Sequence, residues 1–425
     1  MENRKTRRIY AAVLVLILLS GGCGVHNTVV NYSMSNEQIT TVTFFGNKYE
    51  PENVTVIEEI ISDFMDLNPQ IRVSYESLKG SEYYDALAKR MAAGKGDDVF
   101  MVNHDICLEL QAKGQLADLS GLDGLSNYSD QMRSQMEENG KIYWVPTTVS
   151  AFGLYCNLDL LEEHGQNVPQ NLKEWRAVCD YFTERGITPV IANNDISLKT
   201  LAIGRSFHSI YQENRQKEVF NRLNRGEEML SQYLEYGFSL VMEFIEKGYV
   251  DAEKALNTKK TSDDLEEFVK GETPFMLTGA WAAGRVEGMN PGFDFEVVPY
   301  PALDDGVLVV MNADTRLSVN ADSEHLENAM RFVEYFTQTE NIQKFVNQQS
   351  SFSPLKDGSP SYIREIQPMI ACYQSGDTVI GTDSLLNLPI WEWTAEVSQK
   401  LLAGETLHEA MDWLDHQVAP ERQTP

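Results

Sequence analysis

Hydrophobic and polar positions follow two recurring patterns along the first part of the chain. Short stretches rich in β-branched and aromatic residues, at 41–46, 71–77 and 98–103, are typical of strands. Between them, apolar residues recur at helical spacing over 54–69 and 82–94. Single helices between consecutive strands predict βαβ units and a parallel sheet.

The helix expected over 82–94 has an apolar stripe on one side. We expect this stripe to consist of Tyr84, Leu87, Ala88 and Met91. Glu82 and Tyr83 then stand at the start of the helix, outside the stripe.

A second set of strand and helix patterns begins near residue 150. Strand patterns occur at 150–157, 187–192, 274–279, 295–301 and 307–312. Helical patterns occur at 171–186, 229–248, 263–271, 323–338, 391–404 and 406–416. In the helix over 323–338, we expect Leu326, Met330 and Val333 to face inward. The two sets together predict two α/β regions.

The first 23 residues have the composition of an export signal. Basic residues in "MENRKTRR" precede an apolar run over 9–19, which is followed by small residues and Cys23. This run is shorter than the ~20 apolar residues that a permanent membrane-spanning helix needs. "LLSGGC" resembles a bacterial lipobox, although Ser20 stands where leucine is usual. The resemblance implies a signal peptide over 1–22, a lipid on Cys23 and a polar tether over 23–39; an ordinary signal peptide with an incidental cysteine is the alternative.

Composition limits the classes of partner. The 425 residues carry a formal net charge of −28, so a surface that neutralises nucleic-acid phosphates is excluded and a soluble monomer is expected. The length suggests two domains. Besides Cys23, the cysteines are far apart and fit no metal motif, so buried free thiols are expected and disulfides are the alternative; they are Cys107, Cys156, Cys179 and Cys372.

The chain contains no GxSxG, HExxH or P-loop motif, and we expect no metal and no cofactor. His104 and Asp105 lack partners at zinc-ligand spacing. Carboxylates are abundant, so counting residues does not exclude a glycosidase pair.

Several blocks of the sequence resemble extracellular solute-binding proteins, family 1, of bacterial ABC importers, which include maltose- and multiple-sugar-binding proteins. Examples are "GKIYWVPTTVSAFGLYCNLDLLEEHG" and "FVKGETPFMLTGAWAAG". The other matching blocks lie at 58–76, 83–103, 110–120, 171–190 and 295–301, in the order typical of the family. The departures are local, such as "YCN" where "YYN" is common.

The resemblance implies an α/β, two-lobed periplasmic-binding-protein-like fold of the second type, with a hinge and a ligand cleft between the lobes. The chain would cross near 148–152 and return near 306–311. The expected lobes are 40–149 with 307–365, and 150–306 with 366–425. Ligands of such folds lie between the lobes, at loops that follow the carboxyl ends of strands.

A sugar site needs aromatic platforms for the sugar faces and carboxylates or other polar groups for the hydroxyls. Trp281 follows the strand 274–279 and matches a stacking tryptophan of the family, with a core role as the alternative. Asp105 matches a position that accepts hydroxyl hydrogen bonds, and it could also cap the helix that follows it. Of two nearby tryptophans, we expect Trp391 rather than Trp393 to face the cleft. The other candidates are Asn47, Lys48, Glu82, Tyr83, Asn103, His104, Thr148, Ser150 and Asn312.

The expected function is that of a lipid-anchored binding protein on the outer face of the cell membrane. It would capture a mono- or oligosaccharide by hinge closure and deliver it to the transmembrane subunits of an ABC permease. The alternatives are the same fold with another polar solute such as a polyamine or peptide, a lipid-anchored glycoside hydrolase, and a surface adhesin or sensor partner.

Overall fold

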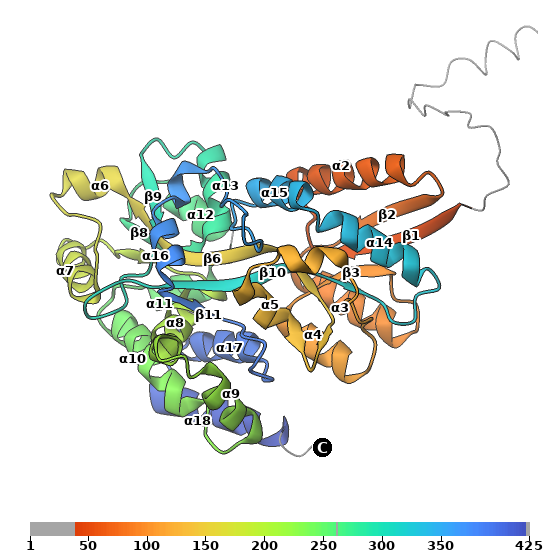
Figure 1. The fold of residues 1–425 in the computed structure, drawn as a ribbon. Helices are drawn as coiled ribbons and strands as arrows, with labels where there is room; N and C mark the ends of the chain where they lie inside the picture. The colour runs from red at the N-terminus through yellow and green to blue at the C-terminus, as the bar shows by residue number, and fades with distance from the viewer. Residues whose placement is uncertain (1–38, 261, 422–425) are drawn as a thin grey trace, which may run out of the picture. The chain divides into compact units, whose positions relative to one another are not determined.

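The computed structural model describes residues 39–260 and 262–421 (Figure 1). The expected signal peptide, nearly all of the expected tether and the lipid site at Cys23 lie outside the described residues. Within them, no helix combines the length and the apolar character needed to cross a membrane.

A nine-stranded sheet with the order β2-β1-β3-β10-β6-β8-β7 organises the described chain, with β11 beside β10 and β9 beside β6. The strands are β1 (Thr40–Gly46), β2 (Ile71–Ser77), β3 (Val99–Val102), β6 (Val145–Asn157), β7 (Val190–Ile191), β8 (Phe275–Gly279), β9 (Phe295–Val298), β10 (Val309–Val319) and β11 (Thr378–Ile380). A separate hairpin pairs β4 (Glu137–Glu138) with β5 (Lys141–Ile142).

Helices cover the sheet on both faces (Figure 1). Around β1–β3 lie α2 (Pro51–Leu67), α3 (Gly80–Ala92), α4 (His104–Ala112), α5 (Asp130–Met136), α14 (Leu326–Phe336) and α15 (Thr339–Gln348). The other half carries α6 (Leu158–Glu163), α7 (Leu172–Thr183), α8 (Ile196–Gln212), α9 (Gln216–Arg225), α10 (Ser231–Glu246), α11 (Ala252–Asn257), α12 (Asp263–Phe268), α13 (Ala283–Gly288), α16 (Met369–Ser375), α17 (Ile390–Leu402) and α18 (Leu407–Glu421).

The strands β6 and β10 run through both halves of the sheet (Figure 1). At one end, residues 316–319 of β10 pair with β3; at the other, residues 309–311 pair with β11. β10 is antiparallel to both β3 and β6, and β6 is antiparallel to β8 and β9. The sheet as a whole is therefore mixed. The parallel pairing expected for the first three strands is confirmed, since β1 is parallel to β2 and β3, and the pairs β7–β8 and β10–β11 are also parallel.

Thr315 has a left-handed backbone conformation in the middle of β10, with a φ of 45°. Such a conformation is strained for a β-branched residue because its side chain crowds the backbone. The Thr315 carbonyl accepts a hydrogen bond from the Thr147 hydroxyl of β6 at 3.0 Å. This strained residue lies between the part of β10 that pairs with β11 and the part that pairs with β3.

Helix α8 is the central buried helix of the second half, and the amphipathic pattern did not predict it. Of its 17 residues, 13 are buried, so it has no polar face to give the usual periodicity. It packs against α10, α17, β8 and β11. The buried polar side chains of α8 therefore require hydrogen-bond or ion-pair partners within the protein, because burying an unpaired polar group costs free energy.

Two predicted burial patterns were wrong in part, although Leu87, Met91 and Val333 are buried as predicted. In α3 the buried positions are Tyr83, Leu87 and Met91, so the stripe begins at Tyr83 and not at Tyr84. In α14, Leu326 is 40% exposed, and the helix packs instead through Ala329, Phe332, Val333 and Phe336. Both helices are rotated slightly from the predicted orientation. The four described cysteines are buried free thiols, as expected.

Candidate ligand-binding site

Three aromatic side chains meet where β6, β8 and α17 come together. Phe152 lies on β6, Trp281 directly after β8, and Trp391 in the first turn of α17. The Phe152 ring is 5.1 Å from Trp281 in an edge-to-face arrangement and 5.5 Å from Trp391. Trp281 and Trp391 are half-buried, whereas Phe152 is buried. We call these three residues the aromatic cluster.

The Trp281 ring lies directly against the backbone of Gly279. A Cβ atom built on Gly279 would stand 2.0 Å from Cζ3 of Trp281, far closer than real Cβ contacts. Only glycine therefore permits this position of the ring. The last residue of β8 thus sets the orientation of the tryptophan that follows it.

Asp105 stands in the first turn of α4, and Asn103 rather than Asp105 is the N-cap of this helix. The Asn103 Oδ1 accepts a hydrogen bond from the Ile106 amide at 2.8 Å. The Asp105 carboxylate accepts a hydrogen bond from the Glu392 amide at the start of α17. Its Oδ1 is buried and has no hydrogen-bond partner among residues 39–260 and 262–421. Burial, and next the charge of Glu392, raise the pKa of Asp105 to about 6.

Lys199 of α8 joins the carboxylate region to the aromatic cluster. Its Nζ donates to Asp195 at 2.6 Å and to the Trp391 carbonyl at 3.0 Å. It also lies 4.1 Å from the centroid of the Trp391 ring. Burial lowers the pKa of Lys199 to about 8, although the charges of Asp195 and Asp105 favour its protonated form.

Polar side chains also line up where β6 and β10 cross between the halves of the sheet. The Ser150 hydroxyl donates a short hydrogen bond to Asp314. Thr148 approaches the Thr315 hydroxyl at 3.4 Å. Burial alone would raise the pKa of Asp314, but the charge of Lys48 and the hydrogen bond from Ser150 outweigh burial and lower it.

The loop after β1 contributes two further side chains. Asn47 donates to the Tyr84 hydroxyl at 3.1 Å, and Lys48 donates to Gln349 at 2.7 Å. Tyr84 is half-buried in α3 and interacts electrostatically with Asp314 and Asp105. Tyr84 is therefore the tyrosine of α3 that lies beside the candidate site.

Tyr83, in contrast, is a core residue, and its expected place in the site was wrong. The Tyr83 hydroxyl donates to the Met101 carbonyl at 2.6 Å and accepts from the Met101 amide at 3.0 Å. Both bonds hold α3 against β3. Glu82 is exposed in the first turn of α3, and none of the hydrogen bonds and ion pairs described here links it to the other candidates.

Two cavities flank α4. The first, of about 670 Å³, is lined by Asp105, Ile106, Glu109, Pro389 and Glu392, among others. A volume of this size is typical of ligand pockets. Asp105, whose Oδ1 is buried and unpartnered among the described residues, is thus one of the residues around this space; we call it the Asp105 cavity.

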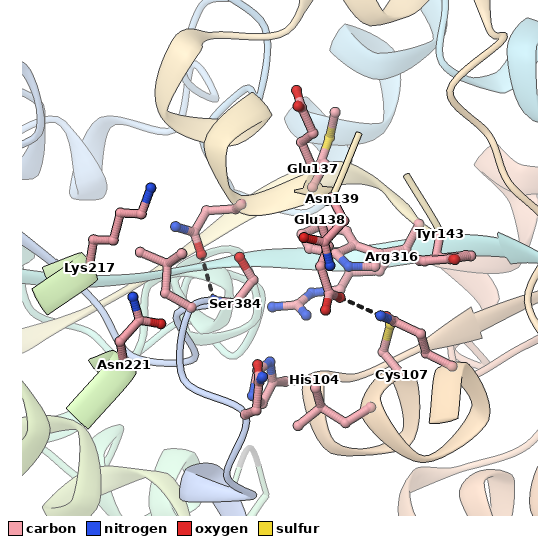
Figure 2. A pocket seen from close by; sticks show the side chains of 17 residues that line it. His104, Cys107, Glu137, Glu138, Asn139, Tyr143, Lys217, Asn221, Arg316 and Ser384 are labelled. Atoms are coloured by element: carbon pink, nitrogen blue, oxygen red, sulfur yellow. Dashed lines mark hydrogen bonds between the residues drawn. The ribbon is translucent and has the colours of Figure 1, made fainter. Parts of the chain in front are cut away.

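The second cavity, of about 300 Å³, contains Arg316, and we call it the Arg316 cavity (Figure 2). Figure 2 shows Lys217 and Asn221 of α9 on one side and Glu137, Glu138 and Asn139 of the hairpin on another. The Arg316 guanidinium lies 4.1 Å from the Trp144 ring and donates to Thr382 at 3.1 Å. This cation is thus held by protein groups.

His104 faces the Arg316 cavity and not the aromatic cluster (Figure 2). Its Nε2 lies 3.1 Å from the Leu386 carbonyl. Burial, and next the charge of Arg316, lower the pKa of His104 to about 3, so its ring is neutral at ordinary pH. Asn312 is also tied to the segment before α17, since its Oδ1 accepts a hydrogen bond from the Thr382 amide at 2.9 Å.

Contacts thus connect most of the predicted residues into one region, from Asn47 through Tyr84 and Asp105 to the aromatic cluster. Trp391 is half-buried within it, whereas Trp393 is buried among the residues beneath α8 and α10. Sequence reasoning missed Tyr84, Phe152, Lys199, Arg316 and Glu392. The described residues contain no cluster of three or more side chains that could hold a metal ion.

The fold and this site define a class of binding protein. Residues 59–365 match the family model described as "Bacterial extracellular solute-binding protein", and the chain belongs to this family. Its fold is the two-lobed type II fold of periplasmic sugar-binding proteins.

Two curated relatives illustrate the similarity. The multiple sugar-binding protein of Streptococcus mutans serotype c is 24% identical over 349 residues, which cover 79% of this chain and 78% of the relative. The melibiose/raffinose/stachyose-binding protein MelE of Bacillus subtilis is 19% identical over 344 residues, which cover 78% and 76%.

Solved structures show the same fold. The binding protein RafE in complex with raffinose has a TM-score of 0.73 and 22% identity, over 90% of this chain and 99% of that one. A sugar transporter protein of Bacillus licheniformis in complex with stachyose has a TM-score of 0.69 and 21% identity, over 90% and 100%.

Proposed function

We propose that this protein binds a carbohydrate outside the cytoplasm and delivers it to an ABC permease without changing it chemically. The observation that carries the proposal is the buried, unpartnered Oδ1 of Asp105, a residue that lines the Asp105 cavity together with Glu392, the chain neighbour of Trp391. A sugar hydroxyl would donate to this oxygen, and the sugar faces would stack on Trp281 and Trp391. The relatives support this ligand class, because they include binders of raffinose, stachyose and melibiose.

Closure of two lobes would couple binding to transport. We place the lobe crossings within β6 near 148–152 and within β10 at 312–315, because the pairing partners of β10 change between Met311 and Arg316. Relative to the expected lobes, 40–149 with 307–365 and 150–306 with 366–425, this division moves residues 307–311 to the second lobe. A ligand that contacts Asp105 from one lobe and Trp281 from the other would stabilise the closed form.

The remaining parts of the proposal concern location and partners. A lipid on Cys23 would hold the protein on the outer face of the membrane, and the transmembrane subunits of the permease would recognise the closed form. Mass spectrometry of Cys23 tests the anchor. An unmodified cysteine in the mature protein would refute it.

Calorimetric titration with a panel of neutral oligosaccharides tests ligand binding directly. We expect raffinose, stachyose or a related sugar to bind, and Trp281→Ala to weaken binding strongly while Glu82→Gln leaves it unchanged. Glu82 is a matched control because it is an exposed member of the original candidates. Small-angle scattering should show a smaller radius of gyration with the sugar; an unchanged radius would argue against closure.

One observation also fits a second function, that of a glycoside hydrolase. The charge of a second carboxylate, Glu392, acts on Asp105, and such enzymes use a pair of carboxylates as acid and base. Chromatography after incubation with the bound sugar separates the two functions. A binding protein returns the sugar intact, whereas turnover beyond one equivalent of protein would establish the hydrolase.

A further inference from the structure

Lys199 is a buried cation whose ammonium group makes three contacts, with two residues. Its side chain is 1% exposed, in the second turn of α8. The Nζ atom donates to the Asp195 carboxylate, donates to the Trp391 carbonyl and lies 4.1 Å from the centre of the Trp391 ring. Two of these three contacts are thus to one residue of the aromatic cluster.

The ion pair with Asp195 does not by itself explain why this lysine is buried. Lys260 also forms a short ion pair with Asp195, from a position that is 46% exposed. Removing an ammonium group from water costs several kcal/mol even after the protein relaxes. Asp195 does not require a second, buried lysine for neutralisation, because the exposed Lys260 already forms an ion pair with it. The contacts with Trp391, in contrast, are made by Lys199.

The surroundings of the Trp391 ring show what these contacts do. Phe152 packs beside the ring at 5.5 Å, and a Cβ atom on Gly381 would approach its Cζ3 to 3.2 Å. Lys199 covers one of the two faces of the ring, so at most one face remains for a ligand. The lysine also holds the backbone of α17 at the same residue, through the carbonyl.

Lys199 acts on Asp105 as well. Its positive charge favours the ionised form of the Asp105 carboxylate, whereas Glu392 opposes it. The charged groups that act on the lysine are Asp195, Lys260 and Asp105. The cation thus contacts an aromatic ring and acts through its charge on a carboxylate, the two kinds of group that a sugar site needs.

We propose that Lys199 is a positioning residue of the binding site, which fixes the Trp391 ring against the aromatic cluster through the carbonyl and one face of the ring. Lys199 itself is too enclosed to contact the ligand. The effect on ligand affinity rests on the proposed sugar-binding function, whereas the effect on Trp391 does not.

The first experiment needs no ligand. Tryptophan fluorescence and acrylamide quenching are compared for the wild type, Lys199→Met, Trp391→Phe and the double variant of these two. We expect Lys199→Met to shift the emission and to increase quenching, and we expect this change to be absent in the Trp391→Phe background. If Lys199→Met alters the fluorescence equally with and without Trp391, or not at all, the lysine does not hold this ring.

The second experiment measures raffinose or the best sugar of the panel by calorimetry. Lys199→Met leaves the half-buried Asp195 with one partner fewer and could lower stability, so Asp195→Asn/Lys199→Met is measured in parallel. We expect both to weaken binding by about tenfold or more, which corresponds to about 1.4 kcal/mol. Lys260→Met, which removes the other partner of Asp195, should bind as the wild type does.

Wild-type affinity in the Asp195→Asn/Lys199→Met variant would overturn the proposal. If the wild type itself binds no sugar of the panel, the proposed function fails, and the fluorescence comparison alone still decides whether Lys199 positions Trp391.

Discussion

Replacing Asp105 by asparagine should stabilise the ligand-free protein and at the same time weaken ligand binding. The pKa of Asp105 is about 6 in the folded protein, against an ordinary value of 3.8. A difference of about 2, at about 1.4 kcal/mol for each pKa unit, corresponds to about 3 kcal/mol. At neutral pH the folded protein therefore bears an ionisation cost of this order, which a neutral amide would remove.

The pH dependence follows from the direction of this shift. Below pH 3.8 the carboxyl is neutral in the folded and unfolded states, so it contributes no difference. Between about pH 4 and 6 the unfolded chain loses the proton first, and the stability of the folded protein falls as the pH rises. Above pH 6 the cost is complete.

Urea unfolding of the wild type and Asp105→Asn at several pH values measures this effect. We expect the variant to be more stable by about 3 kcal/mol at pH 7 and by less than about 1 kcal/mol at pH 4. Asp195→Asn is the matched control with the opposite sign, because Lys199 and Lys260 outweigh burial and lower the pKa of Asp195. That variant should be less stable than the wild type at pH 7.

Ligand titration completes the test. Loss of a charge-assisted hydrogen bond, worth about 1.5–3 kcal/mol, should reduce sugar affinity at least tenfold in Asp105→Asn. The reasoning is refuted if the variant is destabilised at pH 7, or if its stability difference from the wild type does not change between pH 4 and pH 7.

Three further predictions follow from the geometry. Gly279→Ala should weaken sugar binding, measured by calorimetry, with little change in melting temperature, because the added methyl displaces the Trp281 ring; unchanged affinity would contradict the assigned role of this ring. Thr315→Gly should change the free energy of unfolding by less than about 1 kcal/mol, because relief of about 1–2 kcal/mol of left-handed strain offsets the lost packing and the added freedom of the unfolded chain. Thr147→Gly, the control, should lower the free energy of unfolding clearly more. Equal losses of stability in urea unfolding would show that Thr315 is not strained. A uronic-acid analogue of the bound sugar should bind at least tenfold more weakly by calorimetry, because the nearby Lys199 and Arg316 are engaged with protein groups while Asp105 bears a negative charge; equal affinity would refute this expectation.

Hydrophobic periodicity predicted the elements whose burial is one-sided. Strand β2 matches its predicted range, and the choice between Trp391 and Trp393 agrees with the burial of the two rings. Periodicity failed to predict α8, because nearly all of this helix is buried, and the role of Lys199 was therefore not predicted either. In α3, adjacent tyrosines differ by a rotation of 100°, and the pattern could not decide which of Tyr83 and Tyr84 is enclosed.

Within the candidate site, the sequence could predict only those residues that come soon after a strand. Asp105 and Trp281 come after β3 and β8, at positions where loops commonly bear ligands. Lys199 and Arg316, in contrast, lie inside a helix and a strand, and their role depends on neighbours far away in the sequence. A single sequence contains no local signal for such contacts.

The two strands that belong to both halves of the sheet also determine when the protein can finish folding during synthesis. The half that contains β1–β3 lacks its neighbour β10 until residues 309–319 have emerged, after more than 150 intervening residues that belong largely to the other half. Neither half is complete before the last third of the chain has been made, since α17 and α18 pack on α8 and α10. Such long-range pairing slows folding, because distant segments must meet before their contacts contribute stability. A nascent chain of this design can complete neither half of the sheet until most of its residues have been synthesised.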